Sequence, residues 1–353
     1  MKKAMIAMSG GVDSSVAAWL MQQAGYDCIG GTMTLYQQPG DFCGSSQSIE
    51  DAQKIAQRLN FPHHVFPMSR EFEEKVIQKF VDCYECGLTP NPCIDCNRYM
   101  KFDLLLEKAL EMGCDYVVTG HYAQIEKDTA TGRYLMKKAA DLSKDQTYFL
   151  CNLNQHQLSH ILFPLGQLTK EQVRQIAQEQ NFVNAKKRDS QDICFIPDGD
   201  YLSFMERYTG KTYSAGNFLD VNGNIVGTHR GAAGYTLGQR KGLGVAMGEP
   251  VYVCSKNMAE NTVTLGSNEM LYHKVLRANA WNWMPFETLT APLRVTAKAR
   301  SRQTEQPAWV YPEENGYARV EFDEPQRAIT PGQAVVLYDG DTVVGGGTIT
   351  EVI

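Results

Sequence analysis

The sequence predicts an α/β N-terminal domain with a Rossmann-like parallel sheet, followed by a small central β domain and a C-terminal β-barrel. Short apolar strands alternate with helical patterns through the first 180 residues, which is typical of a parallel sheet covered by helices on both faces. From about residue 210, glycine, short β-rich runs and Asn-Gly or Asp-Gly pairs recur at close spacing, which indicates hairpins. We expect the three domains at 1–205, 206–269 and 270–353.

The individual elements follow from apolar periodicity and breaker residues. The helix expected after the first strand is closed by Gly25, and the next one is amphipathic, with Ile55 and Leu59 on its apolar side. The expected strands are 2–8, 27–35, 63–68 and the buried run within 115–123. The expected helices are 14–24, 48–59, 71–86, 102–112, 155–160 and 170–180.

Composition places the chain in an ordinary class. Its 353 residues, 43% hydrophobic and 21% charged, allow two or three domains with sizeable cores. The net charge of −6 does not exclude nucleic acid, because the electrostatic footprint is local. The N-terminal apolar run breaks after Met8, and no stretch approaches the ~20 apolar residues that span a bilayer. We therefore expect a cytoplasmic protein without a membrane segment, whose ten cysteines are mostly free thiols, metal ligands or catalysts.

The segment "SGGVDSS" at 9–15 lies between the first strand and the first helix, where a phosphate site belongs. Gly10 and Gly11 let backbone N–H groups converge on an anion, and Ser14 adds a hydroxyl at a positive helix end. No Gly-Lys-[Ser/Thr] follows, so the loop is not a Walker loop, and it suits chemistry at an α-phosphate with pyrophosphate leaving. Asp13 could hold Mg²⁺, or it could be a carboxylate that the helix dipole stabilises at the N-terminus, and both roles remain open.

Four cysteines form the pattern C-x2-C-x6-C-x2-C, through "CYEC" and "PNPCIDC". On spacing alone, Cys83, Cys86, Cys93 and Cys96 fit a structural zinc site. Against zinc, the helical pattern of 71–86 places the first two on one helix, and so this is the minority interpretation.

Cys194 differs from the other isolated cysteines, because Lys186, Lys187 and Arg188 precede it and nearby cations favour the thiolate. It is thus a candidate for reactive sulfur. We expect four other isolated cysteines to be buried core thiols: Cys28, Cys114, Cys151 and Cys254.

Motifs along nearly the whole chain resemble one family. "SGGVDSS", "TPNPCIDCN", "VTGHYA", "SKDQTYFL", "DSQDICFI", "YTLGQRKGLG", "ARSRQTEQP" and "TPGQAVVLYDG" are similar, in that order, to the bacterial tRNA-specific 2-thiouridylases of the PP-loop ATP pyrophosphatase superfamily. The resemblance implies an adenine nucleotide α-hydrolase-like domain, a central β domain and a barrel. It also implies ATP-dependent 2-thiolation of the wobble uridine, position 34, in tRNAs of the Lys, Glu and Gln type.

The resemblance also implies a sulfur route. ATP adenylates the C2 oxygen of the uridine, and Cys194 carries a persulfide supplied by a sulfur carrier or cysteine desulfurase. Cys96 is the nucleophile that attacks Cys194 and leaves a Cys96–Cys194 disulfide, since releasing sulfane sulfur requires a second thiol. The alternative is a [4Fe–4S] cluster on Cys93, Cys96 and Cys194. We expect a monomer.

The residues implied by resemblance fall into two groups. Those for ATP, which acts with Mg²⁺, are Ala7, Met8, Ser9, Gly10, Gly11, Val12, Asp13, Ser14, Met33 and Gly120. Those for the target base and tRNA are Asn91, Pro92, Cys93, His121, Lys144, Asp145, Gln146, Arg300, Ser301 and Gln333. Ser301 departs from the family, which often has an aromatic residue there, so a stacking contact at that position is in doubt.

Two other functions compete with this one. A PP-loop synthetase or amidotransferase that adenylates a small molecule would share the phosphate loop, but it has no use for Cys96 together with Cys194 or for a C-terminal barrel. A non-enzymatic tRNA-binding or zinc-binding module would have no use for the phosphate loop.

Overall fold

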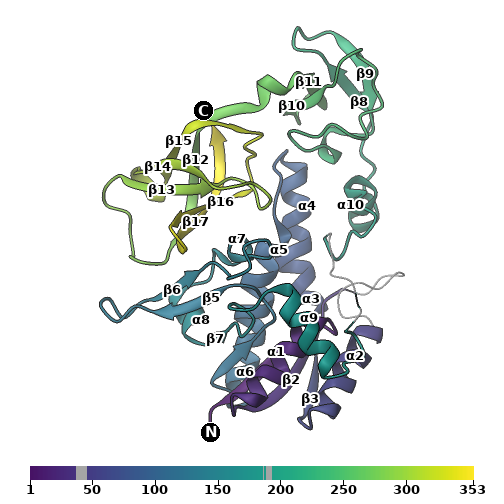
Figure 1. Cartoon of the computed structure of the whole chain (residues 1–353). Coiled ribbons are helices and arrows are strands. Elements are labelled where there is room, and N and C mark those ends of the chain that lie inside the picture. The colour runs from purple at the N-terminus through teal and green to yellow at the C-terminus, as the bar shows by residue number, and fades with distance from the viewer. Residues whose placement is uncertain (37–45, 186, 188–192) are drawn as a thin grey trace.

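Helices cover a five-stranded parallel sheet in the N-terminal part of the chain, and two further sheets follow it (Figure 1). The computed structural model describes residues 1–36, 46–185, 187 and 193–353. The sheet has the order β3-β2-β1-β4-β7, and every neighbouring pair is parallel. Its strands are β1 (Lys3–Ala7), β2 (Asp27–Thr34), β3 (His63–Pro67), β4 (Tyr116–Val118) and β7 (Ile161–Leu162). The predicted α/β class is confirmed.

Two buried clusters occupy the two faces of this sheet. One face packs against α1 (Val12–Gln23), α2 (Ser46–Arg58) and α9 (Lys170–Glu179), which bury small residues and aliphatic side chains there. The other face packs against two long helices and against α7 (Thr147–Leu150) and α8 (Gln155–Ser159). Within the described residues, no helix is both long enough and apolar enough to cross a membrane.

Both long helices contain π-helical segments. The first runs through α3 (Ser69–Phe72), a π segment (Glu73–Ile77) and α4 (Gln78–Glu85), and the second through α5 (Pro92–Asp95), a π segment (Cys96–Leu104) and α6 (Leu105–Glu111). The predicted start of the second helix at 102 is wrong by ten residues. Pro92 occupies the first turn of this helix, where the fixed φ and the missing N–H of proline are tolerated. Polar residues that follow Pro92 interrupt the apolar pattern from which the helix was predicted. Cys93 and Cys96 therefore lie at the start of a helix.

The central β domain follows α10 (Tyr201–Thr209), a helix that the apolar pattern did not reveal. Asp200 caps its N-terminus by accepting the Ser203 N–H, and Gly210 ends it with a left-handed φ of 69°. The domain's sheet has the order β10-β11-β8-β9, with a parallel β11–β8 pair. Its strands are β8 (Gly216–Leu219), β9 (Ile225–His229), β10 (Tyr252–Asn257) and β11 (Thr262–Gly266).

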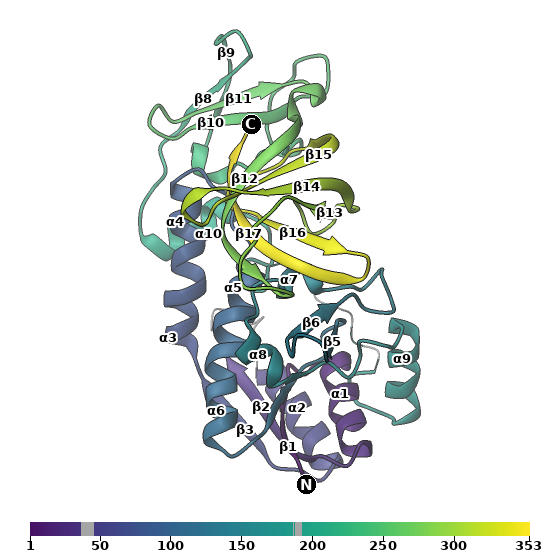
Figure 2. The ribbon, with the colours of Figure 1, turned by 90° about the vertical axis from the view of Figure 1, so that its left-hand side faces the viewer.

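The last six strands form a closed barrel, because β12 pairs with both β15 and β17 (Figure 2). They are β12 (Tyr272–Trp283), β13 (Leu293–Lys298), β14 (Gln306–Pro312), β15 (Ala318–Arg327), β16 (Ala334–Asp339) and β17 (Thr342–Val352). A hairpin of the N-terminal domain, β5 (Gln124–Lys127) with β6 (Tyr134–Lys137), extends this sheet through the pair Thr342 and Lys137. The sequence did not reveal that hairpin.

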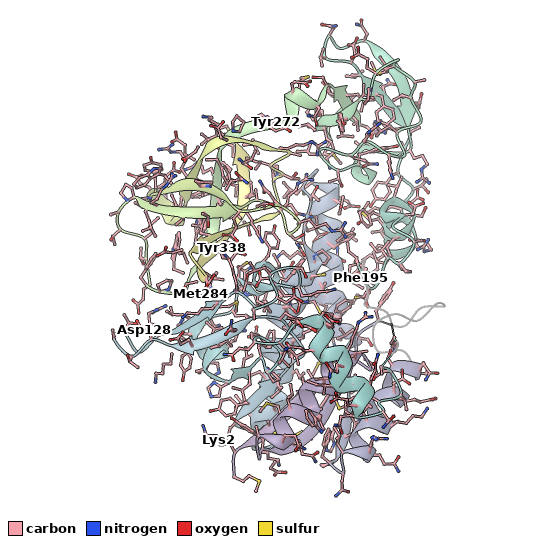
Figure 3. The ribbon with its side chains drawn as sticks, in the orientation of Figure 1. Lys2, Asp128, Phe195, Tyr272, Met284 and Tyr338 are labelled. Atoms are coloured by element: carbon pink, nitrogen blue, oxygen red, sulfur yellow. The ribbon has the colours of Figure 1, made fainter. Side chains whose placement is uncertain are left out.

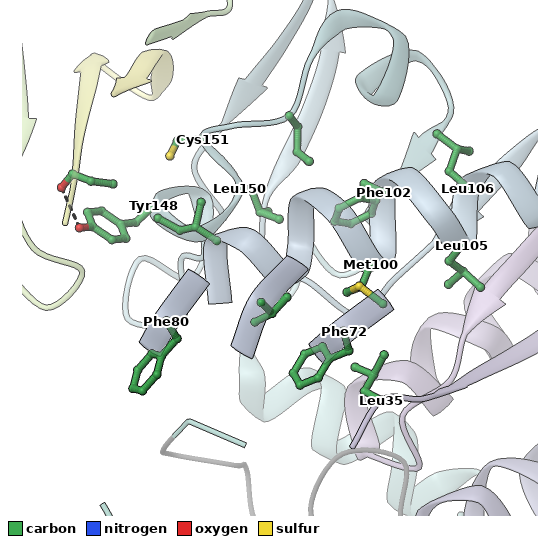
Figure 4. Packing of buried hydrophobic residues seen from close by; sticks show 14 of the residues in the cluster. Leu35, Phe72, Phe80, Met100, Phe102, Leu105, Leu106, Tyr148, Leu150 and Cys151 are labelled. Carbon is green, nitrogen blue, oxygen red and sulfur yellow. Dashed lines mark hydrogen bonds between the residues drawn. The ribbon is translucent and has the colours of Figure 1, made fainter. Parts of the chain in front are cut away.

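The barrel and the α/β domain share one buried core. Tyr148 of α7 donates its hydroxyl to the Ala334 carbonyl at 2.8 Å, the dashed line in Figure 4. The hydroxyls of Thr147 and Tyr338 are 3.2 Å apart in the same contact. Tyr338 and Met284, labelled in Figure 3, belong to the cluster that fills the α/β domain. This continuity fixes the barrel against the helix that carries the cysteines.

Replacing Phe80 by Ala tests the aromatic centre of this core. The buried Phe80 ring lies 4.8 Å from Tyr84 and 5.4 Å from Phe195, measured between ring centroids. We expect Phe80→Ala to lower the free energy of unfolding by about 3–5 kcal/mol, measured by urea denaturation. The control Leu142→Ala removes a side chain that is 69% exposed, and it should change stability by less than about 0.5 kcal/mol. Equal losses in the two variants would contradict the packing.

Candidate active site

The glycine loop lies at the carboxyl end of β1 and leads directly into α1. Gly10 has a φ of +68°, and a Cβ there would lie 2.4 Å from the backbone oxygen of Ser48, so only glycine fits. Ser14 Oγ donates to the Gly11 carbonyl at 3.0 Å and accepts the Ser9 N–H at 3.3 Å. The loop is thus held in shape by its own serines, at the helix end where anions bind.

A later segment of the chain supports the same loop. Asn184, which is buried, donates its amide to the Gly10 carbonyl at 3.1 Å and to Ser15 Oγ at 2.9 Å. Lys187 Nζ lies 3.2 Å from the Gly10 carbonyl and 3.1 Å from Asp51. Of the three predicted basic residues before Cys194, Lys187 therefore faces the loop. Lys186 and Arg188 lie outside the described residues.

An ion pair neutralises Asp13. Lys170 Nζ lies 2.7 and 2.8 Å from its two carboxylate oxygens, and the Tyr122 hydroxyl donates to the carboxylate at 2.9 Å. Lys170 is only 8% exposed and occupies the first turn of α9, where the helix dipole disfavours a cation. Sequence reasoning missed both partners; the signal was the capping box Thr169–Gln172, which places Lys170 at a helix start.

Gly120 touches the loop from the end of β4. A Cβ at Gly120 would lie 2.7 Å from the backbone carbon of Asp13 and 2.9 Å from the Ser14 nitrogen. The carboxyl ends of adjacent parallel strands thus meet the loop, as the rule for open α/β sheets requires. Met8 is buried, and its carbonyl accepts the Thr32 hydroxyl at 2.7 Å. Ala7 and Met33 pack, partly buried, against the larger core.

His121 is buried beside Gly120 and is 8% exposed. Its Nδ1 lies 2.6 Å from the Thr119 hydroxyl, and its Nε2 lies 3.5 Å from Lys101 Nζ. Because an ammonium can only donate, Nε2 accepts and Nδ1 carries the proton. Burial, and secondarily the charge of Lys101, lowers the pKa of His121 well below its usual value. His121 is thus a neutral imidazole at neutral pH.

The two cysteines proposed for sulfur chemistry pack against the same buried cluster. Cys96 and Cys194 are partly exposed, and each contacts the core that contains α4. Lys79 of α4 binds Asp95 at 2.6 Å; burial raises the pKa of that carboxyl although Lys79 opposes the shift. The next residue of α4, Phe80, contacts Phe195, the neighbour of Cys194.

The cysteines do not gather into a metal site. Among the residues that the structure describes, no three Cys, His, Asp or Glu side chains could hold a metal ion together. Cys83, Cys86, Cys93 and Cys96 are all described and do not converge as a ligand set, so the structure gives the zinc interpretation of their spacing no support. Cys83 is half-buried near the end of α4, whereas Cys86 and Cys93 are exposed. The Cys93, Cys96 and Cys194 set is likewise not assembled as a three-ligand site.

Several residues expected at the tRNA make contacts within the protein. Asp145 accepts the Ala139 N–H and the Thr147 hydroxyl, and Gln146 accepts the Tyr122 N–H. The Asp145 partners are near it in the chain, two and six residues away, whereas the Gln146–Tyr122 hydrogen bond joins residues that are 24 apart.

In the barrel, Arg300 donates to the Leu237 carbonyl at 2.8 Å and to the Thr330 hydroxyl at 2.6 Å. Burial, with the nearby charge of Arg327, lowers its pKa. Gln333 donates to the carbonyls of the loop before Cys93. Lys144 and Ser301 are partly exposed.

Three family models match consecutive parts of the chain. A tRNA methyl transferase HUP domain matches residues 2–198, a tRNA methyl transferase PRC-barrel domain matches 202–267, and an aminomethyltransferase β-barrel domain matches 273–349. A solved 4-thiouridine synthetase–RNA complex with bound ATP is 19% identical, with a TM-score of 0.40 over 58% of this chain and 50% of that one.

Full-length relatives decide the family. A protein of Clostridioides difficile (strain 630) named tRNA-specific 2-thiouridylase MnmA is 50% identical over 99% of this chain and 98% of its own length. One of the same name from Acetivibrio thermocellus is also 50% identical, over 99% of both chains. The chain belongs to the tRNA-specific 2-thiouridylase MnmA family. The resemblance predicted from the motifs is confirmed.

Replacing Gly120 by Ala tests the close approach of β4 to the loop. The new methyl would press on the backbone of Asp13 and Ser14, which cannot move aside as a flexible side chain would. We expect the affinity for ATP to fall at least about tenfold, a loss of ~1.4 kcal/mol, measured by isothermal titration calorimetry. The control Gly113→Ala strains a left-handed glycine with nothing within 4 Å. Its ATP affinity should be unchanged, and an equal loss there would contradict the assignment.

The buried His121 predicts a pH dependence of stability. Its pKa is lowered in the folded state, so below about pH 6.5 the unfolded chain binds more protons and stability falls as the pH is lowered. We expect His121→Asn to reduce the slope of the free energy of unfolding against pH, between pH 7 and 5, by up to about 1.4 kcal/mol per pH unit.

Urea denaturation across this pH range measures the slope. Burial also lowers the pKa of His63 and His229, so part of the slope remains in the variant. The control is His64→Asn at an exposed position. An unchanged slope in His121→Asn would refute the neutral buried imidazole.

Proposed function

We propose that the protein is a tRNA-uridine 2-sulfurtransferase, which converts C2 of the wobble uridine, position 34, to a thiocarbonyl while ATP becomes AMP and diphosphate. The observation that carries this proposal is 50% identity, over 99% of the chain, to relatives named tRNA-specific 2-thiouridylase. The shaped phosphate loop supports it, because adenylation needs an anion cradle. The methyl transferase wording of two family models fits less well, since a sulfonium methyl donor has no phosphate for the loop to hold.

The loop would bind the ATP phosphates through the backbone of Gly10 and Gly11 and the hydroxyl of Ser14. Ala7 and Met8 directly precede this loop in sequence, whereas the other two proposed ATP contacts outside it, Met33 in β2 and Gly120 after β4, come from later parts of the chain. Mg²⁺ prefers oxygen ligands, and Asp13 is the carboxylate of the loop. Its ion pair with Lys170 means that Mg²⁺ and the triphosphate would have to exchange with that pair. Magnesium would neutralise phosphate charge during adenylation.

Adenylation makes the uracil oxygen a leaving group. The C2 oxygen attacks the α-phosphorus, diphosphate departs, and AMP later leaves with that oxygen as sulfur bonds to C2. Chemistry on a nucleobase calls for flipping the base out of its stack. Asn91, Pro92 and Cys93 at the start of the cysteine helix, together with His121, are the proposed contacts of the flipped base. A neutral His121 can position the base but brings no positive charge to it.

Sulfur would arrive as a persulfide on Cys194, delivered by a sulfur carrier or cysteine desulfurase. The Cys96 thiolate attacks the inner sulfur of Cys194, the terminal sulfur leaves as sulfide toward C2, and a Cys96–Cys194 disulfide forms. A two-electron thiol reductant then restores both thiols. Cys93, Cys96 and Cys194 are not assembled as a ligand set, so the proposed sulfur route uses the persulfide and not a [4Fe–4S] cluster.

The proposed organisation keeps the boundaries 1–205, 206–269 and 270–353. Lys144, Asp145 and Gln146 in the first domain, with Arg300 and Ser301 in the barrel, are the proposed tRNA-contacting positions. Gln333, the third barrel residue expected at the tRNA, donates its side-chain amide to the loop before Cys93. Asp145 and Arg300 are engaged within the protein, so their contribution would be to hold the surface that meets RNA. We further propose a cytoplasmic monomer acting on the anticodon loops of Lys, Glu and Gln tRNAs.

Serine variants of the two cysteines test the sulfur route. We expect Cys96→Ser and Cys194→Ser each to abolish 2-thiouridine formation, at least about 1,000-fold, because a hydroxyl neither carries sulfane sulfur nor releases it. Mass spectrometry of tRNA nucleosides measures the product, and filter binding should show nearly unchanged tRNA affinity. The control Cys86→Ser, at an exposed thiol, should retain full activity.

Two outcomes would contradict the proposal. Thiolation by either Cys96→Ser or Cys194→Ser would contradict the proposed sulfur transfer between Cys194 and Cys96. Diphosphate release that depends on ATP and a small molecule, without any need for tRNA, would favour a synthetase or amidotransferase instead.

A further inference from the structure

A turn of the barrel forms hydrogen bonds with the loop that precedes the helix carrying Cys93 and Cys96. The turn comprises Pro331, Gly332 and Gln333, between β15 and β16. The Pro331 carbonyl accepts the Thr89 N–H at 2.9 Å, and the Gln333 side-chain amide donates to the carbonyls of Thr89 at 2.9 Å and Pro90 at 3.2 Å. Three hydrogen bonds thus join two segments more than 240 residues apart.

The turn itself is held rigidly. Gly332 has a φ of +90°, its N–H donates to the Ile349 carbonyl at 2.8 Å, and the Ile349 N–H donates to the Gln333 carbonyl at 2.9 Å. A Cβ at Gly332 would lie 2.9 Å from the Thr89 nitrogen. The barrel therefore fits the loop closely, and the geometry requires glycine at this point.

The loop has few ways to satisfy its own backbone. Thr89, Pro90 and Pro92 are buried, and the two prolines have no N–H to donate. Buried carbonyls without a donor are costly, and the Gln333 amide supplies the donor for two of them. Asn91, which begins the helix, makes no side-chain cap. The entry of the helix that carries Cys93 and Cys96 thus depends on the barrel turn.

We propose that Gln333 is a positioning residue, through which the barrel sets the orientation and exposure of Cys96. It acts through the loop 88–91, because its amide donates to that loop. The proposal rests on the proposed function for its consequence in catalysis. The barrel would then be a structural part of the sulfur-transfer site in addition to any role in holding RNA.

Three substitutions at one position separate the possible roles of the amide. Gln333→Glu keeps the shape but turns a carboxylate toward two carbonyls, and Gln333→Met removes the donors without adding charge. Gln333→Lys retains a donor of similar reach. The matched control is Gln306→Glu, at a barrel glutamine whose amide donates to Thr304 in its own segment.

The decisive measurement uses the full-length enzyme without tRNA or ATP. Alkylation of Cys96 by iodoacetamide is followed by peptide mass spectrometry. We expect the rate to rise roughly fivefold or more in Gln333→Glu and Gln333→Met, because two hydrogen bonds that restrain the loop are lost. Gln333→Lys and Gln306→Glu should stay within about twofold of the parent chain. In thiolation assays, Gln333→Met should have a lower kcat than the parent chain and an unchanged KM for tRNA.

An unchanged alkylation rate in both donor-less variants would overturn the proposal, and a rise in KM for tRNA alone would make Gln333 an RNA contact instead. If the glutamate variant does not fold, the methionine variant decides. Failure of the parent chain to thiolate tRNA would refute the proposed function, whereas the alkylation comparison would still decide the role of Gln333.

Discussion

Helix α4 makes the contacts on which the arrangement of the site depends. Lys79 on this helix pairs with Asp95 beside Cys96, while Phe80 packs on Phe195 beside Cys194. The Tyr84 hydroxyl lies 3.5 Å from that of Thr236 in the central β domain. One helix thus orders two cysteine segments that are almost one hundred residues apart in sequence. The ion pair is half-exposed on its lysine side and contributes little alone, so the aromatic packing is the stronger constraint.

The phosphate loop and the cysteines proposed for sulfur transfer lie on different parts of the fold. The loop depends on backbone contacts that exclude a Cβ at Gly10 and Gly120. The cysteine helix depends on side-chain packing and on the barrel turn that contacts Thr89. In the proposed reaction, the substrate base meets the activated phosphate and the sulfur in a geometry that the α/β sheet and the barrel define together.

The charges at the site are either paired or suppressed. Asp13 is paired with Lys170, and His121 is kept uncharged by burial and by Lys101. Buried charges are costly unless they are paired, and the pair of Lys170 with Asp13 meets this requirement beside the loop. In the proposed reaction, Mg²⁺ and the triphosphate would exchange with this pair without leaving an isolated charge behind. The net charge of −6 therefore says little about the local field that a phosphate would meet.

The sequence by itself determined the α/β class, the phosphate loop and the order of the three parts, because these depend on local periodicity and on residues adjacent in the chain. It placed the start of the cysteine helix ten residues late, since polar residues after Pro92 conceal the helical period. It also gave no sign of the β5–β6 hairpin that extends the barrel. Only the tertiary structure decided that Lys170 pairs with Asp13 and that Gln333 meets Thr89. Such contacts join distant segments, and no local pattern encodes which of many similar polar side chains will meet.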